Sequence, residues 1–346
     1  MLTVLSQAFP CSIYFLFYIS FLLNNKDFPM LLHIFIDHLK VQIKIFFDLI
    51  HHEWMTLKAA DEIDILRRYA NFSKRFNVVI FVLLMFIVNI FCLYQFFPDF
   101  LDVIIPLNES RDHHLTFVAE YFVDQQRYIY PILIHSLLAI YMGVIAVLST
   151  GTTLIAFLLH ICAMLKIASY RLECVNDNIP LVSKSEKNNI IRERIINAVN
   201  IHRRALEFAE SILSSFSTFY FIMIGVGISS LTINMFQFMQ LMMFTSDTNG
   251  MLASGFLILS HFTYMFIGNL AGQIVTDHNN NIFNAMYILK WYTMSIEAQK
   301  LLLFIIQTNT KTYYLIIGNI FAASLEGFAT LMSMTVSYFT MIYSTR

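Results

Sequence analysis

Long runs of apolar residues alternate with charged stretches along the whole chain. A helix that crosses a lipid bilayer needs about 20 mostly apolar residues. Six runs meet this requirement, at residues 4–23, 78–97, 132–165, 212–243, 252–275 and 315–342. The pattern therefore predicts an all-α, polytopic helical membrane protein with six clear spans. Three of the runs exceed the required length, so we expect those helices to tilt or to continue beyond the bilayer.

A seventh apolar segment, at residues 30–50, is interrupted by ionisable side chains. It carries His33, Asp37, His38, Lys40, Lys44 and Asp48. Charges at this density are costly at bilayer depth. We therefore predict an amphipathic helix on the inner membrane surface, with a true span as the alternative.

The charged connectors at residues 24–77, 166–211 and 276–314 also show helical spacing. Apolar residues recur in each at positions that share one face of a helix. These residues are Leu57, Ile63, Leu66 and Tyr69, then Ile191, Ile195, Ala198 and Ile201, and finally Ala285, Ile288, Leu289 and Tyr292. We expect the connectors to extend the spans into a cytosolic anchor bundle, all within one transmembrane domain over residues 1–346. Solvated connecting helices are the alternative.

Composition narrows the class of protein. The chain has 346 residues, of which 58% are hydrophobic and only 13% charged, and its mean hydropathy is +0.64. The charged share is about half that of a soluble domain, so an ordinary soluble enzyme, a disordered chain and a disulfide-rich secreted scaffold are excluded. With a net charge of −1, nucleic acid is not an expected partner. We expect the four cysteines to be free thiols and no cleaved signal peptide to be present.

Loop charges predict the orientation in the membrane. Nineteen of the 22 Lys and Arg residues fall in the three connectors, and the other side has only Arg111, Arg127 and Arg346. Because basic residues concentrate on the cytosolic side, we expect residues 98–131 and the C-terminus to be exterior. Asn108 starts an Asn-Glu-Ser sequence in that exterior segment and is the candidate glycosylation site.

Motifs for catalysis or for tightly bound groups are missing from the sequence. It contains no GxGxxG, GxxxxGK[ST], HExxH or CxxC pattern. Its histidine pairs, 51–52 and 113–114, are adjacent, whereas two ligands on one helical face need a spacing of three or four. We therefore expect no enzyme activity, no catalytic residue, no metal site and no cofactor.

The last apolar run carries a stripe of small and polar residues. Spacings of three and four place Ser324, Gly327, Thr330, Ser333, Ser337, Met341 and Ser344 on one helical face. Hydroxyls with an apolar Met341 near the end suit a water-filled pore with a hydrophobic constriction, enclosed by several copies of this helix. Small residues also allow close packing between membrane helices, so both interpretations remain open on spacing alone.

The C-terminal third of the chain carries a series of motifs in a fixed order. They are Tyr264, Gly268-Asn269-Leu270, Asn284-Ala285-Met286-Tyr287, Trp291-Tyr292, Gln299-Lys300-Leu301-Leu302, Gly318, Phe321, Ser324-Leu325-Glu326, Phe328 and Ser337-Tyr338-Phe339-Thr340. These motifs resemble those of the insect odorant receptor family, whose members are seven-helix ligand-gated cation channels. A first cytosolic connector with Glu53-Trp54, Glu62, Tyr69-Ala70 and Arg75 extends the similarity to residue 45 onward. The family has seven spans, so residues 4–23 are expected to match its second helix, with the first one missing.

The resemblance implies a function and a location. The chain would lie in the plasma membrane of olfactory sensory neurons, with its C-terminus extracellular, in a heterotetramer with the obligate odorant co-receptor. Four last helices would line a non-selective cation pore through Ser333, Ser337, Met341 and Ser344, with Met341 as the gate. The ligand would be a small hydrophobic volatile molecule bound in the outer half of the helix bundle. Its expected contacts are Asn89, Leu93, Tyr94, His135, Ser136, Met142, Ala146, Phe256, Ser260 and Tyr264.

Three alternative functions are also considered for a chain of this pattern. A gustatory receptor of the sister family would have the same architecture, although here the last helix ends in Ser-Tyr-Phe-Thr rather than in a Thr-Tyr, leucine-rich sequence. A membrane transporter predicts inverted repeats and broken helices, which the sequence does not show. A membrane protein that packs through its last helix without forming a pore is the third.

Overall fold

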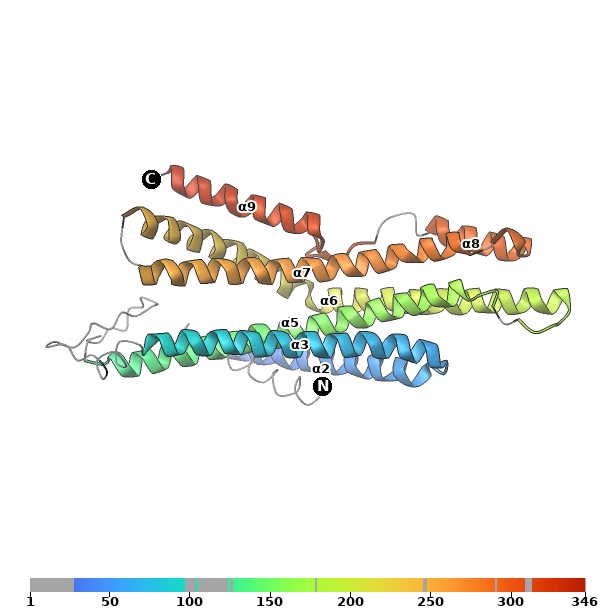
Figure 1. The fold of residues 1–346 in the computed structure, drawn as a ribbon, viewed down its shortest axis with the longest axis horizontal. Helices are drawn as coiled ribbons and strands as arrows, with labels where there is room; N and C mark the ends of the chain where they lie inside the picture. Colours follow the sequence, from blue (N-terminus) through green and yellow to red (C-terminus); the bar gives the residue numbers. More distant parts are fainter. Residues whose placement is uncertain are drawn as a thin grey trace. The chain divides into compact units, whose positions relative to one another are not determined.

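The chain is helical throughout most of the part that the structure describes. This computed structural model describes residues 28–96, 104, 124, 127–177, 179–244, 248–289, 291–308 and 313–345. The expected all-α fold is confirmed, and the expected span at residues 4–23 lies outside the described residues. The helices are α2 (Phe28–Thr56), α3 (Ala60–Gln95), α5 (Ile129–Glu173), α6 (Lys184–Phe244), α7 (Thr248–Ile288), the 3-10 helix η1 (Trp291–Thr293), α8 (Ile296–Thr308) and α9 (Leu325–Ser344) (Figure 1).

Four of these helices are long and apolar enough to cross a membrane. They contain the stretches Ala60–Leu93, Ile129–Glu173, Tyr220–Phe244 and Gly250–Ile288, and an 18-residue segment within each has a mean hydropathy between 1.5 and 2.8. Helices α5, α6 and α7 contain 45, 61 and 41 residues. At 1.5 Å per residue they extend over about 68, 92 and 62 Å, whereas the hydrocarbon core of a bilayer is about 30 Å thick. The expected excess of helix beyond the spans is therefore present, and residues 30–50 are helical, within α2.

The expected span at residues 315–342 is wrong in its first part. Two short antiparallel strands occupy this stretch, β1 (Ile316–Ile317) and β2 (Phe321–Ala322), and α9 begins only at Leu325. Gly318 and Asn319 at the turn have φ angles of 63° and 59°. Positive φ at two consecutive residues breaks a right-handed helix, and Gly and Asn are the residue types that tolerate it best. The remaining 20 residues of α9 still extend about 30 Å.

The chain divides into two compact units. The first unit comprises Met1–Phe46, Phe72–Leu154 and Asp247–Ala253, and the second comprises Phe47–Asn71, Ile155–Ser246 and Ser254–Arg346. The charged connectors contribute much of the second unit. The apolar face predicted for the connector at residues 166–211 is confirmed within α6, since Ile191, Ile195, Ala198 and Ile201 are all buried. Leu57 and Leu66 of the first connector are buried as well. The connectors are therefore packed helices rather than solvated ones.

The predicted face at the end of α7 is only half correct. Ala285 and Leu289 are buried, but Ile288 and Tyr292 are 73% and 66% exposed. Burial follows a line through Ile282, Ala285 and Leu289, and Ile288 lies to one side of it. The α-helix ends at Ile288 and the chain enters η1, so the helical register does not continue to Tyr292.

Ion pairs connect the helices of the second unit. Arg171 of α5 donates from Nε and Nη2 to the two carboxylate oxygens of Glu62 on α3, at 2.7 and 2.8 Å, and from Nη1 to the carbonyl of Asn197 on α6 at 3.0 Å. Arg204 of α6 donates to Glu53 of α2 at 3.0 Å. Because Glu62 is buried, its charge depends on Arg171 for compensation.

Two consecutive residues of α7 form hydrogen bonds to two different helices. The Nε2 atom of His278 lies 2.6 Å from the hydroxyl of Tyr69 on α3, and the Nε2 atom of His202 on α6 lies 2.9 Å from Oδ1 of Asn279. His202 and Asn279 are both buried. Burial disfavours the charged imidazolium and holds the pKa of His202 below its usual 6.5, although the hydrogen bond to Asn279 opposes this shift.

This lowered pKa predicts that acid destabilises the second unit. Below pH 6.5 the unfolded chain binds a proton at His202 and the folded chain does not, so stability is lost as the pH falls towards the folded pKa. The loss for one proton is at most about 1.4 kcal/mol per pH unit. Unfolding of the detergent-purified chain, measured at pH 7.5 and 5.5, is expected to show a smaller difference in His202→Gln than in the wild type. An equal difference in both proteins would contradict the assignment to His202.

Candidate pore helix and ligand-contacting residues

Two hydrogen bonds and a cluster of aromatic rings hold the first turn of α9 in place. Ser324 is the N-cap, and its hydroxyl accepts a hydrogen bond from the amide of Gly327 at 3.0 Å. The amide of Leu325 donates to Oε1 of Gln273 on α7 at 3.3 Å. The ring of Phe328 lies against Phe262 and Phe266 of α7, with ring centroids 5.1 and 5.4 Å apart. The early positions of the predicted stripe therefore do not line an open face, because Ser324 is a buried cap.

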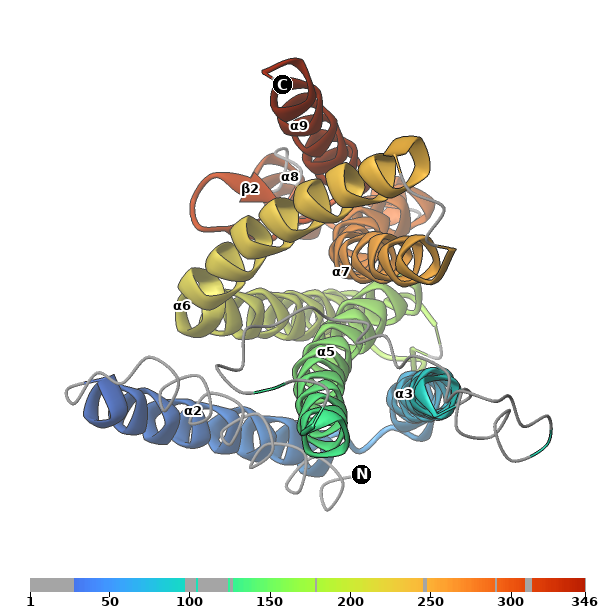
Figure 2. The same ribbon diagram turned by 90° about the vertical axis from the view of Figure 1, so that its left-hand side faces the viewer.

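The rest of the predicted stripe lies on an exposed face of α9. Leu331 and Thr335 are the buried residues of this helix, which packs mainly against α6 (Figure 2). Ser333 and Ser337 follow them by two positions, about 200° around the helix. Met341 is 64% exposed, and Ser333, Ser337 and Ser344 are exposed too. The four predicted pore residues thus share the face that points away from the packed side.

The serine hydroxyls on this face use their protons within the helix and leave their oxygens available as acceptors. Ser333, Ser337 and Ser344 donate their hydroxyl protons to backbone carbonyls of the same helix, namely those of Ala329, Ser333 and Met341. Each hydroxyl oxygen keeps its acceptor capacity. The exposed face can therefore accept hydrogen bonds from water or coordinate a cation, and Met341 interrupts it with an apolar side chain.

Five of the predicted ligand contacts lie in the first unit and have side chains that the structure describes. They are Asn89, Leu93, His135, Ser136 and Met142. Asn89 of α3 accepts a hydrogen bond from the hydroxyl of Tyr141 on α5 at 2.8 Å and donates to the carbonyl of Met85 at 2.7 Å. Leu93 and His135 are exposed, Met142 is half-buried, and Ser136 donates to the carbonyl of Leu133. Sequence reasoning missed Tyr141, because nothing in its local pattern pairs it with a residue 52 positions away.

Three further predicted contacts lie in the second unit on one face of α7. Phe256, Ser260 and Tyr264 follow one another at intervals of four residues and are all exposed. Ser260 donates its hydroxyl proton to the carbonyl of Phe256 at 2.8 Å. The expected contacts are thus divided between the two units, and their assembly into one site stays a prediction. Asn108 and the side chains of Tyr94 and Ala146 lie outside the described part of the chain.

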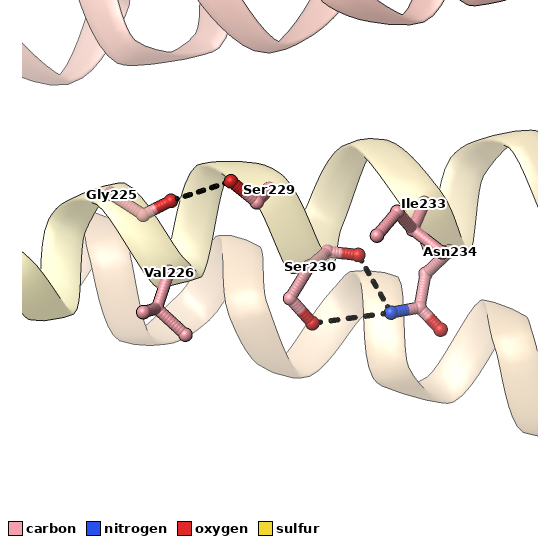
Figure 3. A pocket seen from close by; sticks show the side chains of 6 residues that line it. All are labelled: Gly225, Val226, Ser229, Ser230, Ile233 and Asn234. Atoms are coloured by element: carbon pink, nitrogen blue, oxygen red, sulfur yellow. Dashed lines mark hydrogen bonds between the residues drawn. The ribbon is translucent and has the colours of Figure 1, made fainter.

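A pocket of about 470 Å³ lies along α6 and was not predicted. Ser229 donates to the carbonyl of Gly225 at 2.9 Å, and Nδ2 of Asn234 donates to the carbonyl of Ser230 at 2.8 Å (Figure 3). The four-residue spacing of these small and polar side chains inside an apolar run was the available signal. The lining residues are Gly225, Val226, Ser229, Ser230, Ile233 and Asn234.

Metal and thiol chemistry has little support within the described residues. Among them, no group of three or more His, Cys, Asp or Glu side chains could hold a metal ion. Cys92, Cys162 and Cys174 are free thiols. Burial raises the pKa of Cys174 above its usual value, which disfavours the reactive thiolate.

Long apolar helices, packed connectors and an exposed hydroxyl face on the last helix define a multi-pass helical membrane protein. The chain belongs to the 7tm Odorant receptor family, whose sequence model matches residues 30–336. This match favours the odorant receptor expectation over the gustatory one.

Individual relatives agree with this assignment. Odorant receptor 9a of Drosophila melanogaster is 22% identical over 214 residues, covering 62% of this chain and 51% of the relative, so the match spans about half the relative's length. The olfactory receptor OR5 of Machilis hrabei, solved in complex with eugenol, has a similar fold with a TM-score of 0.58 and 12% identity, covering 93% of this chain and 92% of that one. Another structure of OR5 gives a TM-score of 0.60 and 15% identity, covering 99% and 88% of the two chains. At these identities the structures show the fold alone.

Proposed function

We propose that this chain is an odorant-gated cation channel subunit. It binds a small hydrophobic volatile molecule among its membrane helices and opens a non-selective cation pore lined by α9. It assembles as a heterotetramer with the odorant co-receptor. The observation that carries the proposal is the exposed face of Ser333, Ser337, Met341 and Ser344, in a chain whose family is that of odorant receptors.

The pore assignment follows from the cost of polar groups in lipid. A hydroxyl oxygen that faces hydrocarbon gains no further partner, whereas one that faces water or a passing cation does. A row of three serines is therefore better suited to an aqueous path than to lipid. Met341 supplies the apolar ring of a gate when several copies surround one axis.

The ligand assignment follows from the character of the predicted contacts. Phe256 and Tyr264 provide apolar surface on one face of α7, and Ser260 places a single hydroxyl between them. Leu93 and Met142 provide more apolar surface in the first unit, beside the Asn89–Tyr141 hydrogen bond. A site of this composition holds its ligand mainly by burial, worth about 25 cal/mol per Å² of apolar area, with few directional bonds.

The proposed orientation rests on the charge distribution of the connectors. The packed connectors face the cytosol, and the end of α9 faces the exterior of the plasma membrane of the sensory neuron. This orientation places Met341 and Ser344 near the outer mouth of the pore.

Whole-cell recording tests the proposed function. Cells that express this chain together with the co-receptor are exposed to a panel of volatile compounds, and cells with either protein alone serve as controls. We expect an odour-evoked, non-selective cation current that requires both proteins. No current from a chain shown by surface labelling to reach the plasma membrane, across a broad panel, would contradict the proposal.

The gate assignment predicts a leak in Met341→Ser. Removing the apolar ring allows water to enter the constriction, so a current is expected without odorant, and ion selectivity should change. Val336→Ser is the matched control, since Val336 is 49% exposed on α9 but lies about 140° around the helix. Equal basal currents in the two variants would show that Met341 does not face the pore.

A further inference from the structure

The described contacts of α9 gather in its first three turns. Ser324 caps the helix, the amide of Leu325 is hydrogen-bonded to α7, and the ring of Phe328 packs against α7. Leu331 and Thr335 are the buried residues that follow. Beyond Thr335, most of the large side chains are exposed, including Tyr338, Met341 and Tyr343, and Phe339 is half-buried. The hydroxyl of Tyr343 lies 4.0 Å from the sulfur of Met243 on α6, which is a weak contact. The helix is thus held firmly at its beginning and loosely at its end.

The hairpin before α9 is seated on α6. The amide of Gly318 donates to the hydroxyl of Ser217 on α6 at 2.7 Å. A Cβ atom at Gly318 would lie 2.5 Å from the ring of Phe221, so only glycine allows this approach at this position. The chain therefore enters α9 from a support on α6, at the junction that Figure 1 shows between α7 and α9.

A single side chain of α7 completes the junction. Gln273 accepts the hydrogen bond of the Leu325 amide through Oε1 and donates through Nε2 to Oδ1 of Asp277, at 2.9 Å. Because Asp277 accepts from Nε2 of Gln273, the Oε1 atom of that amide is turned towards α9. The Leu325 amide is one of the donors that a helix leaves without an internal partner at its beginning.

We propose that Gln273 is the positioning residue that couples α7 to the pore helix. This inference rests on the proposed function. Tyr264, the last predicted ligand contact on α7, precedes Gln273 by nine residues, or about 14 Å along the helix. A ligand-dependent displacement of α7 reaches the beginning of α9 through Gln273 and, because the far end is weakly held, moves Met341 most.

The decisive variants change the two hydrogen bonds of Gln273. Gln273→Leu removes both bonds. The paired exchange of Gln273→Glu with Asp277→Asn keeps the net charge and both bonds, with the amide donor now on residue 277. Gln299→Leu is the matched control, because Gln299 bonds within its own segment, to the carbonyl of Met294.

Two measurements on this chain distinguish this inference from the proposed function. In hydrogen–deuterium exchange of the purified protein, Gln273→Leu should speed exchange at residues 325–331 by about two- to tenfold, the factor that one neutral hydrogen bond provides. The paired exchange and Gln299→Leu should match the wild type. In cells with the co-receptor, Gln273→Leu should raise the half-activating odorant concentration by a similar factor, with unchanged unitary conductance and ion selectivity.

Each outcome decides a separate question. Unchanged exchange in Gln273→Leu would overturn the positioning role, whatever the currents show. Unchanged half-activating concentration at normal surface expression would overturn the coupling role, and so would a change in unitary conductance, since that marks a pore-lining residue. Faster exchange in a chain that carries no odorant-evoked current would support the positioning of α9 and overturn the proposed function instead.

Discussion

Arg171→Ala is expected to destabilise the protein by about 3–5 kcal/mol, the cost of breaking a buried ion pair. The substitution leaves the carboxylate of Glu62 buried without its partner, since Glu62 is only 8% exposed. It also removes the hydrogen bond from Arg171 to the carbonyl of Asn197 on α6. Denaturant unfolding in mixed micelles, followed by tryptophan fluorescence, measures the loss.

Two comparisons make this result specific. Arg67→Ala removes an ion pair to Asp64, in which both side chains are more than half exposed. It should cost no more than about 0.5 kcal/mol. Replacing both members of the buried pair by apolar residues, as in Arg171→Met with Glu62→Leu, should recover most of the loss. If Arg171→Ala behaved like Arg67→Ala, the Arg171–Glu62 pair would have to be solvated.

Gly272→Ala is expected to separate α7 from the segment that leads into α9. A Cβ atom at Gly272 would overlap the carbonyl oxygen of Ala323 and lie 2.6 Å from the Cβ of that residue. The obstacle is backbone at the end of the hairpin, which cannot move aside as a flexible side chain can. Overpacking of this kind costs about 1–3 kcal/mol, and we expect odorant-evoked current to be lost as well.

Gly268→Ala provides the matched control for this prediction. Gly268 lies one turn earlier on α7, and a Cβ atom there would meet nothing within 4 Å. Alanine is favoured over glycine in a helix by about 1 kcal/mol, so this variant should be neutral or slightly stabilising. Surface labelling and unfolding are compared for the two variants. Equal tolerance of both would show that α7 and the hairpin are not in close contact.

The spacing of apolar residues identified those helices whose buried or exposed face repeats every three or four residues. The spans predicted at 132–165, 212–243 and 252–275, and residues 78–95 of the span predicted at 78–97, fall in helices long and apolar enough to cross a membrane. The buried face of Ile191, Ile195, Ala198 and Ile201 follows from their three- and four-residue spacing. The exposed face of α9 from Ser333 onward follows in the same way, because an exposed helix face repeats with the same period as a buried one.

Hydropathy failed where an apolar stretch takes another backbone conformation. Residues 315–323 are as apolar as a span, and the signal against a helix was the Gly318-Asn319 pair. The same turn explains why Ser324, predicted as part of the pore stripe, is a helix cap. A hydropathy average does not register backbone dihedral angles, so the beginning of the last helix was placed about ten residues too early.

The sequence by itself thus determined the class of protein, most of its helices and the exposed face of its last helix, because these depend on composition and short-range spacing. Only the tertiary structure decided which polar groups meet. Arg171 and Glu62 are 109 residues apart, Tyr69 and His278 are 209 apart, and Gln273 reaches Leu325 across 52. The physical reason is that such pairs form between helices, and their partners are set by helix packing rather than by any pattern along the chain.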